Sequence, residues 1–321
     1  MDVFDLHCDT LYECVKHGRE LMDNPFAVDL RRGRAYRRWA QVFAVWMPDF
    51  LRGEPAFEQC VRTLRFAREQ ADTYADQMTL VTDADLLDGA LLNERCGALL
   101  GIEGASALAG SLEHLEEAAA LGVRIVTLTW NGSNELGHGS GSGCADGLTS
   151  FGRMAVRKME QLGVIPDVSH LNEKGFWDVA EEAQGPFIAS HSDSAAVHPH
   201  TRNLTDDQFR EIAGRGGLVG LNLCGEHLGL AGEETAEQPT FEPLMRHLDH
   251  FLSLGGETVL AFGCDLDGTD LPARWGGIEV YGRMKEALLR NRYEEQLLDR
   301  LFFGNCYDFI HSALTTGGRM G

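Results

Sequence analysis

The feature that most restricts the fold of this chain is a regular alternation of short apolar segments and amphipathic helical patterns. Apolar runs of this kind are typical of buried parallel strands, and the helical patterns between them are typical of βα units. Eight such runs predict an α/β fold, a (β/α)8 barrel of the TIM type with extra C-terminal helices, as one domain over residues 1–321. The predicted strands are 3–9, 40–46, 97–102, 123–129, 164–169, 186–190, 217–223 and 258–263.

The predicted helices follow from apolar residues at three-to-four spacing and from local end signals. Ser111 is a suitable N-cap for a helix over 111–121, and Gly122 ends it. Two helices, near 281–290 and 294–313, are expected after the last strand. The others are expected at 56–76, 151–162, 172–183, 206–213 and 241–254.

The charge balance of the chain excludes some classes of partner. It has 28 Lys and Arg against 49 Asp and Glu, a formal net charge of −21. Binding to nucleic acid or to an anionic membrane needs clustered cations, so neither partner is expected. The N-terminus has no secretory pattern, and no apolar run approaches the roughly 18 residues of a membrane span, so we expect a cytoplasmic protein.

The eight cysteines are scattered through the chain without a Cys-x-x-Cys pair. This spacing predicts neither a zinc ribbon nor a redox dithiol. We therefore expect buried, reduced thiols.

Metal-binding side chains recur where the predicted strands end. In a barrel of this type those ends meet at one rim, which carries the active site. His7 and Asp9 end the first strand, where residues two apart project to the same side. The later strands end at Glu103, His170, His191 and Asp265. Because so many buried ionisable groups would be costly without a cation, the rim is predicted to bind metal.

The number of donors indicates two metal ions rather than one. Five ligands, His7, Asp9, Glu103, His170 and His191, exceed the three that a single catalytic zinc needs. Two Zn²⁺ per chain with a bridging carboxylate would use them all, and the acid at the third strand end is the natural bridge. The ligand types favour zinc, although other divalent transition metals also accept mixed nitrogen and oxygen donors. Asp265 would then be free for proton transfer.

Six segments of the chain, in order, resemble the motif series of the membrane (renal) dipeptidase family, peptidase family M19. The resemblance runs over nearly the whole chain, and as a set the motifs are specific. They are Asp5-Leu6-His7-Cys8-Asp9, Gly101-Ile102-Glu103-Gly104, Gly147-Leu148-Thr149-Ser150-Phe151-Gly152, Asp167-Val168-Ser169-His170, Ile188-Ala189-Ser190-His191-Ser192 and Gly263-Cys264-Asp265-Leu266-Asp267-Gly268.

The resemblance implies a binuclear zinc barrel that hydrolyses dipeptides, often including those with a C-terminal D-residue. It places His7 and Asp9 on one zinc, His170 and His191 on the other, and Glu103 on both. Asp265 matches the catalytic acid of the family, with Asp267 left open as an alternative. Arg202 matches the arginine that receives the substrate carboxylate, a contact that suits a guanidinium fork. Family members also suggest a homodimer.

One departure from the family concerns the residue after the fourth predicted strand. Trp130 stands where many members have a histidine that contacts the substrate. Tryptophan can donate one hydrogen bond but cannot titrate, so substrate scope and rate are open while the metal site is not. The sequence also shows no secretory signal or membrane-anchor pattern like those of the animal enzymes, and we therefore expect an intracellular protein.

Two other functions stay open at this stage. One is another metal-dependent amidohydrolase, acting on N-acyl amino acids or lactones. The other is a barrel that binds ligands without catalysis, which the retained ligand set disfavours. His198, His200 and His227 could line the pocket, and the Gly-rich segment 137–143 is expected to be a mobile loop over or beside it. Surface or structural places are expected for His17, His114, His138, His247, His250 and His311.

Overall fold

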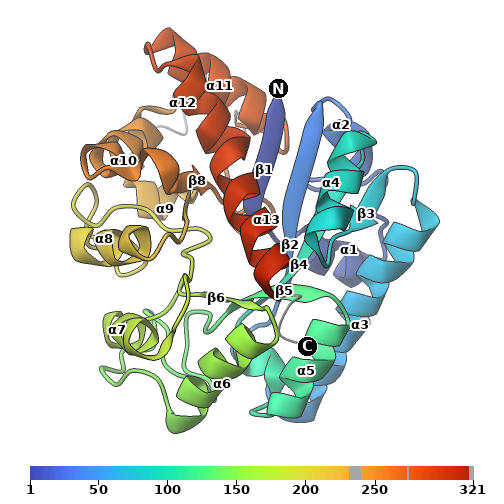
Figure 1. The fold of residues 1–321 in the computed structure, drawn as a ribbon, viewed down its shortest axis with the longest axis vertical. Helices are drawn as coiled ribbons and strands as arrows, with labels where there is room; N and C mark the ends of the chain where they lie inside the picture. The colour runs from blue at the N-terminus through green and yellow to red at the C-terminus, as the bar shows by residue number, and fades with distance from the viewer. Residues whose placement is uncertain (231–239, 273–274, 318–321) are drawn as a thin grey trace.

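The computed structural model describes residues 1–230, 240–272 and 275–317. Its centre is a parallel sheet that curls on itself and is surrounded by helices (Figure 1). The strands are β1 (Asp2–Cys8), β2 (Arg38–Trp46), β3 (Met78–Leu80), β4 (Cys96–Glu103), β5 (Val123–Thr127), β6 (Ile165–Asp167), β7 (Val219–Leu221) and β8 (Leu260–Phe262). Their hydrogen-bonded order is β6-β5-β4-β2-β1-β8-β7, with β3 paired to β4.

Isolated parallel bridges close this sheet into a barrel. Asp167 bridges to Ile188, and Ala189 bridges to Val219, so the short segment between β6 and β7 occupies the remaining gap. The predicted α/β barrel of the TIM type is therefore confirmed. The expected strand at 186–190 is present as these bridges alone, and at its end the N–H of Ser190 donates to the Asp167 carboxylate at 2.9 Å.

The helices between the strands agree with the predicted ones to within a few residues, and several start at side-chain caps. Asn172 and Thr205 accept hydrogen bonds from backbone N–H groups at the first turns of α7 and α8. The helices are α1 (Thr10–His17), α2 (Leu30–Gly33), α3 (Gly53–Thr73), α4 (Ala84–Leu92), α5 (Leu112–Ala120), α6 (Ser150–Gln161), α7 (Glu173–Glu182), α8 (Asp206–Gly214), α9 (Gly225–Leu228), α10 (Glu242–Ser253), α11 (Val280–Arg290), α12 (Glu295–Asp299) and α13 (Asn305–Gly317).

Three details of the secondary structure differ from the prediction. Strand β3 was not expected, because only Met78 of its three residues is buried and so no periodic pattern marks it. The short helices α1, α2, α4 and α9 were also not expected. The single helix predicted at 294–313 is two helices, since a π-helical turn at Arg300–Gly304 separates α12 from α13.

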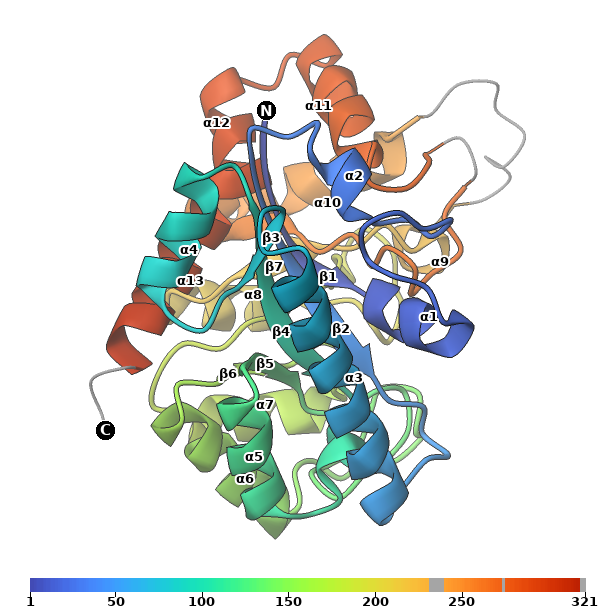
Figure 2. The same cartoon turned by 90° about the vertical axis from the view of Figure 1, so that its right-hand side faces the viewer.

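Helix α13 packs against one end of the barrel. Its Cys306, Ile310 and Leu314 are buried with Phe4 and Leu6 of β1 in one apolar cluster. Figure 2 shows α13 on one side of the barrel, whereas α1 and α9, which follow β1 and β7, lie on the other side. The end where the strands start is thus covered by the last helix, and the end where they finish is left for a site.

The Gly-rich segment 137–143 lies beside the strand ends, as expected, and is packed there. The N–H of Ser140 donates to the carbonyl of His170 at 2.7 Å. A side chain at Gly139 would overlap the carbonyls of Trp130 and Asn131, so glycine at this position permits a close approach of two backbones. In the described part of the chain, no helix has the length and apolar character that crossing a membrane requires.

Candidate metal centre and active site

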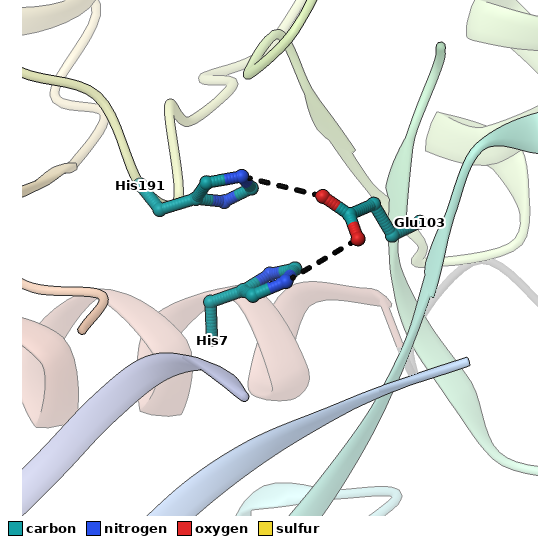
Figure 3. A group of neighbouring side chains, drawn as sticks. All are labelled: His7, Glu103 and His191. Carbon is teal, nitrogen blue, oxygen red and sulfur yellow. Dashed lines mark ion pairs between the residues drawn. The ribbon is translucent and has the colours of Figure 1, made fainter. Parts of the chain in front are cut away.

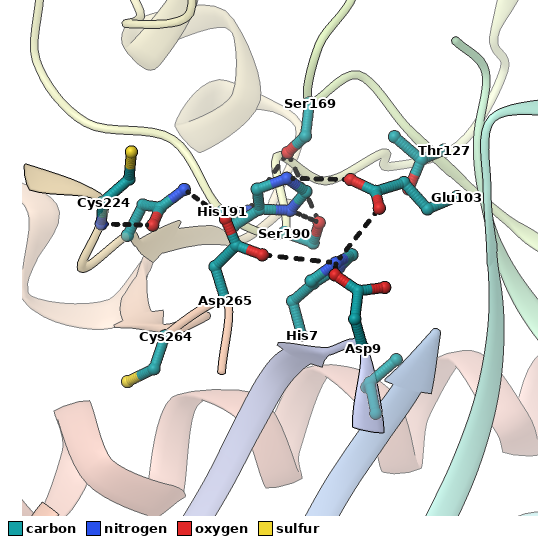
Figure 4. A network of polar contacts seen from close by, with 12 residues as sticks. His7, Asp9, Glu103, Thr127, Ser169, Ser190, His191, Cys224, Cys264 and Asp265 are labelled. Atoms are coloured by element: carbon teal, nitrogen blue, oxygen red, sulfur yellow. Dashed lines mark hydrogen bonds and ion pairs between the residues drawn. The ribbon is translucent and has the colours of Figure 1, made fainter. Parts of the chain in front are cut away.

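The predicted rim residues come together at the ends of the strands, and Figure 4 shows five of them, His7, Asp9, Glu103, His191 and Asp265. His7 lies near the end of β1, Glu103 is the last residue of β4, and Asp9 precedes α1. His170 and Asp265 follow β6 and β8 with left-handed backbones, at φ 67° and 57°. Such a φ is uncommon outside glycine and occurs where the surrounding structure holds a side chain in a required direction.

The Glu103 carboxylate lies close to three histidines, with His7 facing one oxygen and His170 and His191 facing the other. Its Oε2 is 3.6 Å from His7 Nε2, while its Oε1 is 2.9 Å from His170 Nε2 and 3.3 Å from His191 Nε2. Figure 3 shows one carboxylate oxygen directed toward His191 and the other toward His7, which lie one above the other on the same side of Glu103. Each carboxylate oxygen therefore faces a different set of imidazole nitrogens.

Two further carboxylates face the same histidine of β1. His7 Nε2 is 3.6 Å from Asp9 Oδ2 and 3.9 Å from Asp265 Oδ1. One donor atom from each of these three residues lies within 4.8 Å of the others, and the same holds for the group of His7, Glu103 and His191. All of them are buried, so the donors surround one small volume.

The charges in this cluster are strongly coupled. Burial would lower the pKa of His7, but the Glu103 and Asp9 carboxylates outweigh it and raise that pKa well above its usual value. Burial would likewise raise the pKa of Glu103, yet the charge of His7, together with the imidazoles of His170 and His191 beside the carboxylate, holds it well below the usual range. Burial and the charge of Glu103 raise the pKa of Asp9 to about 7.

The pKa values of His170 and His191 are both lowered, which favours their neutral forms. Burial, with the charge of Arg202 as a smaller cause, lowers the pKa of His170 to about 4. Burial and the charge of His7 also lower the pKa of His191 well below its usual value. Their Nε2 atoms nevertheless lie 2.9 Å apart. Two neutral rings aimed at one another in this way are suited to sharing a cation.

Unpaired polar atoms in the cluster also fit a metal. Among the described residues, His7 Nε2 and Asp9 Oδ1 are buried without a hydrogen-bond partner. An orphaned buried donor or acceptor costs about 1–3 kcal/mol, and a bound cation would remove that cost. Imidazole and carboxylate donors without sulfur suit zinc and other divalent transition metals. The residues present therefore fit the metal that the sequence predicts.

His191 is oriented by the residue before it. Ser190 Oγ donates to Asp167 Oδ2 at 2.6 Å, so its lone pair is free to accept from His191 Nδ1 at 2.7 Å. The proton of the ring is then on Nδ1, and Nε2 carries a lone pair toward Glu103. A partner of this kind on the far nitrogen fixes the tautomer and orientation of a metal-binding histidine.

Asp167 is the anchor of this arrangement. Its Oδ1 accepts the backbone N–H groups of Ser169 and Ser190, at 3.0 and 2.9 Å. Its Oδ2 accepts the hydroxyl of Thr127 at 2.6 Å in addition to that of Ser190. One buried carboxylate thus joins the ends of β5 and β6 to the bridge segment that leads into His191.

The other rim residues have comparable supports. Asn131 Oδ1 lies 2.9 Å from Nδ1 of His170 and leaves Nε2 facing Glu103. Asp5 accepts the N–H of His7 at 2.9 Å and that of Cys264 at 2.9 Å, which joins β1 to β8. Hydrogen bonds from neighbouring strands and loops of the barrel thus fix the positions of the histidines.

Asp265 and Asp267, which sequence could not separate, have different surroundings. Asp265 Oδ1 faces His7, and its Oδ2 accepts from Asn222 Nδ2 at 3.4 Å. Asp267 accepts from Thr10 Oγ1 at 2.5 Å and from the N–H of Ala27 at 2.7 Å. The second carboxylate therefore ties α1 and the 26–28 segment to the rim, and the first faces the donor cluster.

A cavity of ≈ 390 Å³ opens beside the cluster and has an aromatic wall. Trp130 packs edge-on against Trp46, with ring centres 5.0 Å apart, and Trp46 packs against Tyr12 at 4.7 Å. Lining residues on the other sides include Glu103, His170, His227 and Asp265. Of the three histidines that could line a pocket, His227 does so here, and His200 lines the neighbouring cavity.

Arg202 lines that neighbouring cavity of ≈ 260 Å³ rather than the aromatic one. Its guanidinium donates to the carbonyl of His191 at 3.0 Å and lies 3.4 Å from Ser192 Oγ. Its Nε is buried and has no partner among the described residues. Burial lowers the pKa of this guanidinium, and the charges of Asp265 and Glu103 oppose that shift. The Arg202 side chain is therefore held beside the cluster, and its Nε–H group is available to donate a hydrogen bond.

Sequence reasoning missed the residues that position the rim side chains. Ser190, Asn131 and Asn222 were not singled out, nor were Tyr12 and Trp46, which line the cavity beside the rim. Ser190 and Asp167 lie within motifs next to the histidines, so adjacency to a ligand was the available signal. The partner of His170 comes from a loop, and no spacing in the sequence marks it.

Comparison with known proteins places the chain in a family. The sequence model of the membrane dipeptidases, peptidase family M19, matches residues 1–316. This chain belongs to the membrane dipeptidase family. An uncharacterized protein in the pqqA 5' region of Klebsiella pneumoniae is 37% identical over 210 residues, which are 64% of this chain and 77% of that protein.

Solved structures of M19 peptidases share the whole fold of this family member. A structure described as dipeptidase AC, a metallopeptidase of family M19, has a TM-score of 0.89, 27% identity and coverage of 98% of this chain and 99% of that one. A metallopeptidase from Rhodobacter sphaeroides, liganded with a phosphinate mimic of the dipeptide L-Ala-D-Ala, has a TM-score of 0.88, 26% identity and coverage of 97% and 98%. The chain is thus a metal-dependent dipeptidase, as the sequence predicted.

Proposed function

We propose that this M19 dipeptidase binds two zinc ions through its rim residues and hydrolyses dipeptides, including those with a C-terminal D-residue. The observation that carries the proposal is the divided Glu103 carboxylate, whose Oε2 faces His7 at 3.6 Å and whose Oε1 faces His170 at 2.9 Å. We assign one zinc to His7, Asp9 and Glu103. The other is assigned to Glu103, His170 and His191.

The zinc pair, when bound, would supply Lewis-acid polarisation of the peptide carbonyl and a lowered pKa for a water molecule. The protein would supply proton transfer through Asp265. Burial and the Glu103 charge raise the pKa of this carboxyl, while His7 opposes the shift, so the group is suited to accepting and releasing a proton. Asn222 holds Oδ2 at 3.4 Å, which leaves Oδ1 to take the proton and deliver it to the departing amine.

We assign substrate orientation to Arg202 and Trp130. Arg202 would bind the terminal carboxylate of the dipeptide, a charge-assisted contact that its unpaired Nε favours. Trp130 would pack on the N-terminal side chain as part of the aromatic wall, since its ring lies 6.4 Å from that of His170. The tolerance of a C-terminal D-residue is proposed by analogy with the Rhodobacter sphaeroides enzyme and its L-Ala-D-Ala mimic.

The test is metal content per chain together with release of amino acids from L,L and L,D dipeptides. We expect about two zinc ions in the purified protein. Asp265→Asn should keep that metal and lose turnover by roughly 10²–10⁴-fold, whereas His191→Ala should lose metal. Unchanged metal content and unchanged turnover in both variants would contradict the assignment.

A second outcome would redirect the function while keeping the site. Full metal content without turnover of any dipeptide, but with hydrolysis of N-acyl amino acids or lactones, would identify a different amidohydrolase. A folded, metal-free protein with no hydrolytic activity would support a binding barrel. Each result separates the metal assignment from the substrate assignment.

A further inference from the structure

The loop between β5 and α6 carries three metal-competent side chains that the proposed function does not use. They are His138, Cys144 and Asp146. A ring nitrogen, the thiol sulfur and a carboxylate oxygen of these residues all lie within 4.8 Å of one another. All three come from a stretch of nine positions, so a metal ion bound here would cross-link two parts of the same loop.

The backbone under two of these side chains is fixed by a helix cap. Asn172 Nδ2 donates to the carbonyls of Cys144 and Asp146, at 2.9 and 2.8 Å. The same Asn172 accepts the N–H of Gly175 at the start of α7, at 2.8 Å. Ser142 Oγ accepts the N–H of Cys144 at 3.2 Å. These backbone hydrogen bonds bring the thiol and the carboxylate together, and Cys144 Sγ lies 3.9 Å from Asp146 Oδ2 as a weak donor to it.

The imidazole has the support that metal-binding histidines usually have. His138 Nδ1 is 2.7 Å from Ser133 Oγ, and the two residues also form an antiparallel backbone bridge. The carbonyl of His138 accepts from the N–H of Asn172 at 3.0 Å. A hydroxyl on one ring nitrogen sets the ring orientation and leaves the other nitrogen for coordination.

We propose that His138, Cys144 and Asp146 form a separate site for a divalent transition metal, with zinc as the expected ion. A sulfur donor selects against magnesium and calcium, which take oxygen ligands, and a mixed set of nitrogen, sulfur and oxygen suits zinc. Cys144 binds as the thiolate, so its proton is released to solvent as the metal enters. Three protein ligands leave one position for water in a tetrahedral site.

The location of this site gives it a structural consequence for the rim. Ser140, between His138 and Cys144, donates its N–H to the carbonyl of His170 at 2.7 Å. Asn131, at the start of the same loop, contacts the ring of His170 at 2.9 Å. A metal that joins the two halves of the loop would hold both contacts in place.

Cobalt substitution distinguishes this site from the catalytic centre. Nitrogen and oxygen donors make up the proposed catalytic ligand set, so a sulfur-to-cobalt charge-transfer band in the near ultraviolet would come from a thiolate elsewhere. The experiment uses the full-length protein, depleted with a chelator and titrated with Co²⁺. We expect the band in the parent protein and in His191→Ala, and its loss in Cys144→Ser.

Matched variants make the result decisive. Cys224→Ser removes the other half-buried thiol of the chain and should keep the band. His311→Gln removes a half-buried histidine outside the loop and should keep it as well, whereas His138→Gln should weaken Co²⁺ binding at least tenfold. Asp146→Asn, at an exposed position, should also weaken Co²⁺ binding.

Two outcomes would overturn the proposal. One is a parent protein that shows no sulfur-to-cobalt band at saturating Co²⁺. The other is a band that persists in Cys144→Ser or disappears in Cys224→Ser. Neither depends on dipeptide turnover, so the loop site can fail while the proposed catalytic function stands, and the reverse also holds.

Discussion

Replacement of Ser190 by alanine tests how the barrel positions a metal-binding histidine. Ser190 Oγ is the acceptor for His191 Nδ1 at 2.7 Å, and its own proton is used by Asp167 at 2.6 Å. Alanine removes both interactions and leaves the ring of His191, which is 0% exposed, with a buried N–H and no acceptor. The tautomer with a lone pair on Nε2 is then no longer imposed.

The expected loss has two parts. Removing the partner of a metal-bound histidine usually weakens metal affinity by about 10–100-fold, or about 1.4–2.7 kcal/mol. The stranded N–H and the lost bond to Asp167 should together lower the free energy of unfolding of the metal-free protein by about 3 kcal/mol. Asp167 keeps its other three donors, so the barrel itself should still fold.

The assay is a competition titration of the metal-depleted protein with a chromophoric zinc chelator, paired with urea unfolding. Ser194→Ala is the matched control, because Ser194 is equally buried and its hydroxyl has no hydrogen-bond partner among the described residues. Zinc affinity in Ser190→Ala that stays within about twofold of the control would refute the orientation argument.

Three other perturbations have expected outcomes. In Gly268→Ala the added Cβ would overlap the carboxylates of Asp9 and Asp265, so turnover should be abolished. Gly282→Ala is the control, because a Cβ there meets open space and turnover should be unchanged. Initial rates on one dipeptide test both variants. Burial lowers the pKa of His247 to about 4, and its Nδ1 accepts from Ser194 N–H at 2.9 Å, so the folded protein holds this ring neutral. As the pH drops, His247 takes up a proton in the unfolded chain before it does so in the folded protein. The free energy of unfolding should therefore fall by up to about 3 kcal/mol between a pH of about 6.5 and a pH of about 4. Urea unfolding of His247→Asn should lack this part of the pH dependence. Trp130→Leu should keep the metal and raise KM for dipeptides up to about tenfold, and an unchanged KM would remove Trp130 from the proposed substrate contacts.

The parts of the fold that sequence predicted are those in which buried residues repeat. Strand β4, whose eight residues are all buried, is marked by a continuous apolar run, and the long helix α3 is marked by buried residues at three-to-four spacing. Strand β3 has three residues and one buried side chain, so it was not recognisable. The break between α12 and α13 is a local change in backbone hydrogen bonding. The apolar pattern continues through it, so the sequence predicted one helix.

At the rim, the sequence predicted residues at strand ends but not the residues that contact them in the folded chain. His7, Glu103 and His191 were predicted because strand ends converge and because their side chains can bind metal. Asn131 was not, since its contact with His170 spans 39 positions and depends on how a loop folds back. Asp265 and Asp267 differ in what faces each of them, and that is known only when the barrel has closed.

The covering of the barrel by α13 has a consequence for synthesis of the chain. Phe4 and Leu6 of β1 are buried with Ile310 and Leu314 of α13, so the first and last elements share one apolar cluster. Until α13 has been synthesised, β1 lacks these contacts, and this part of its apolar surface stays open to chaperones and to neighbouring chains. Completion of the barrel core is therefore expected to depend on contacts between residues about 300 positions apart, and long-range contacts of this kind make folding slow.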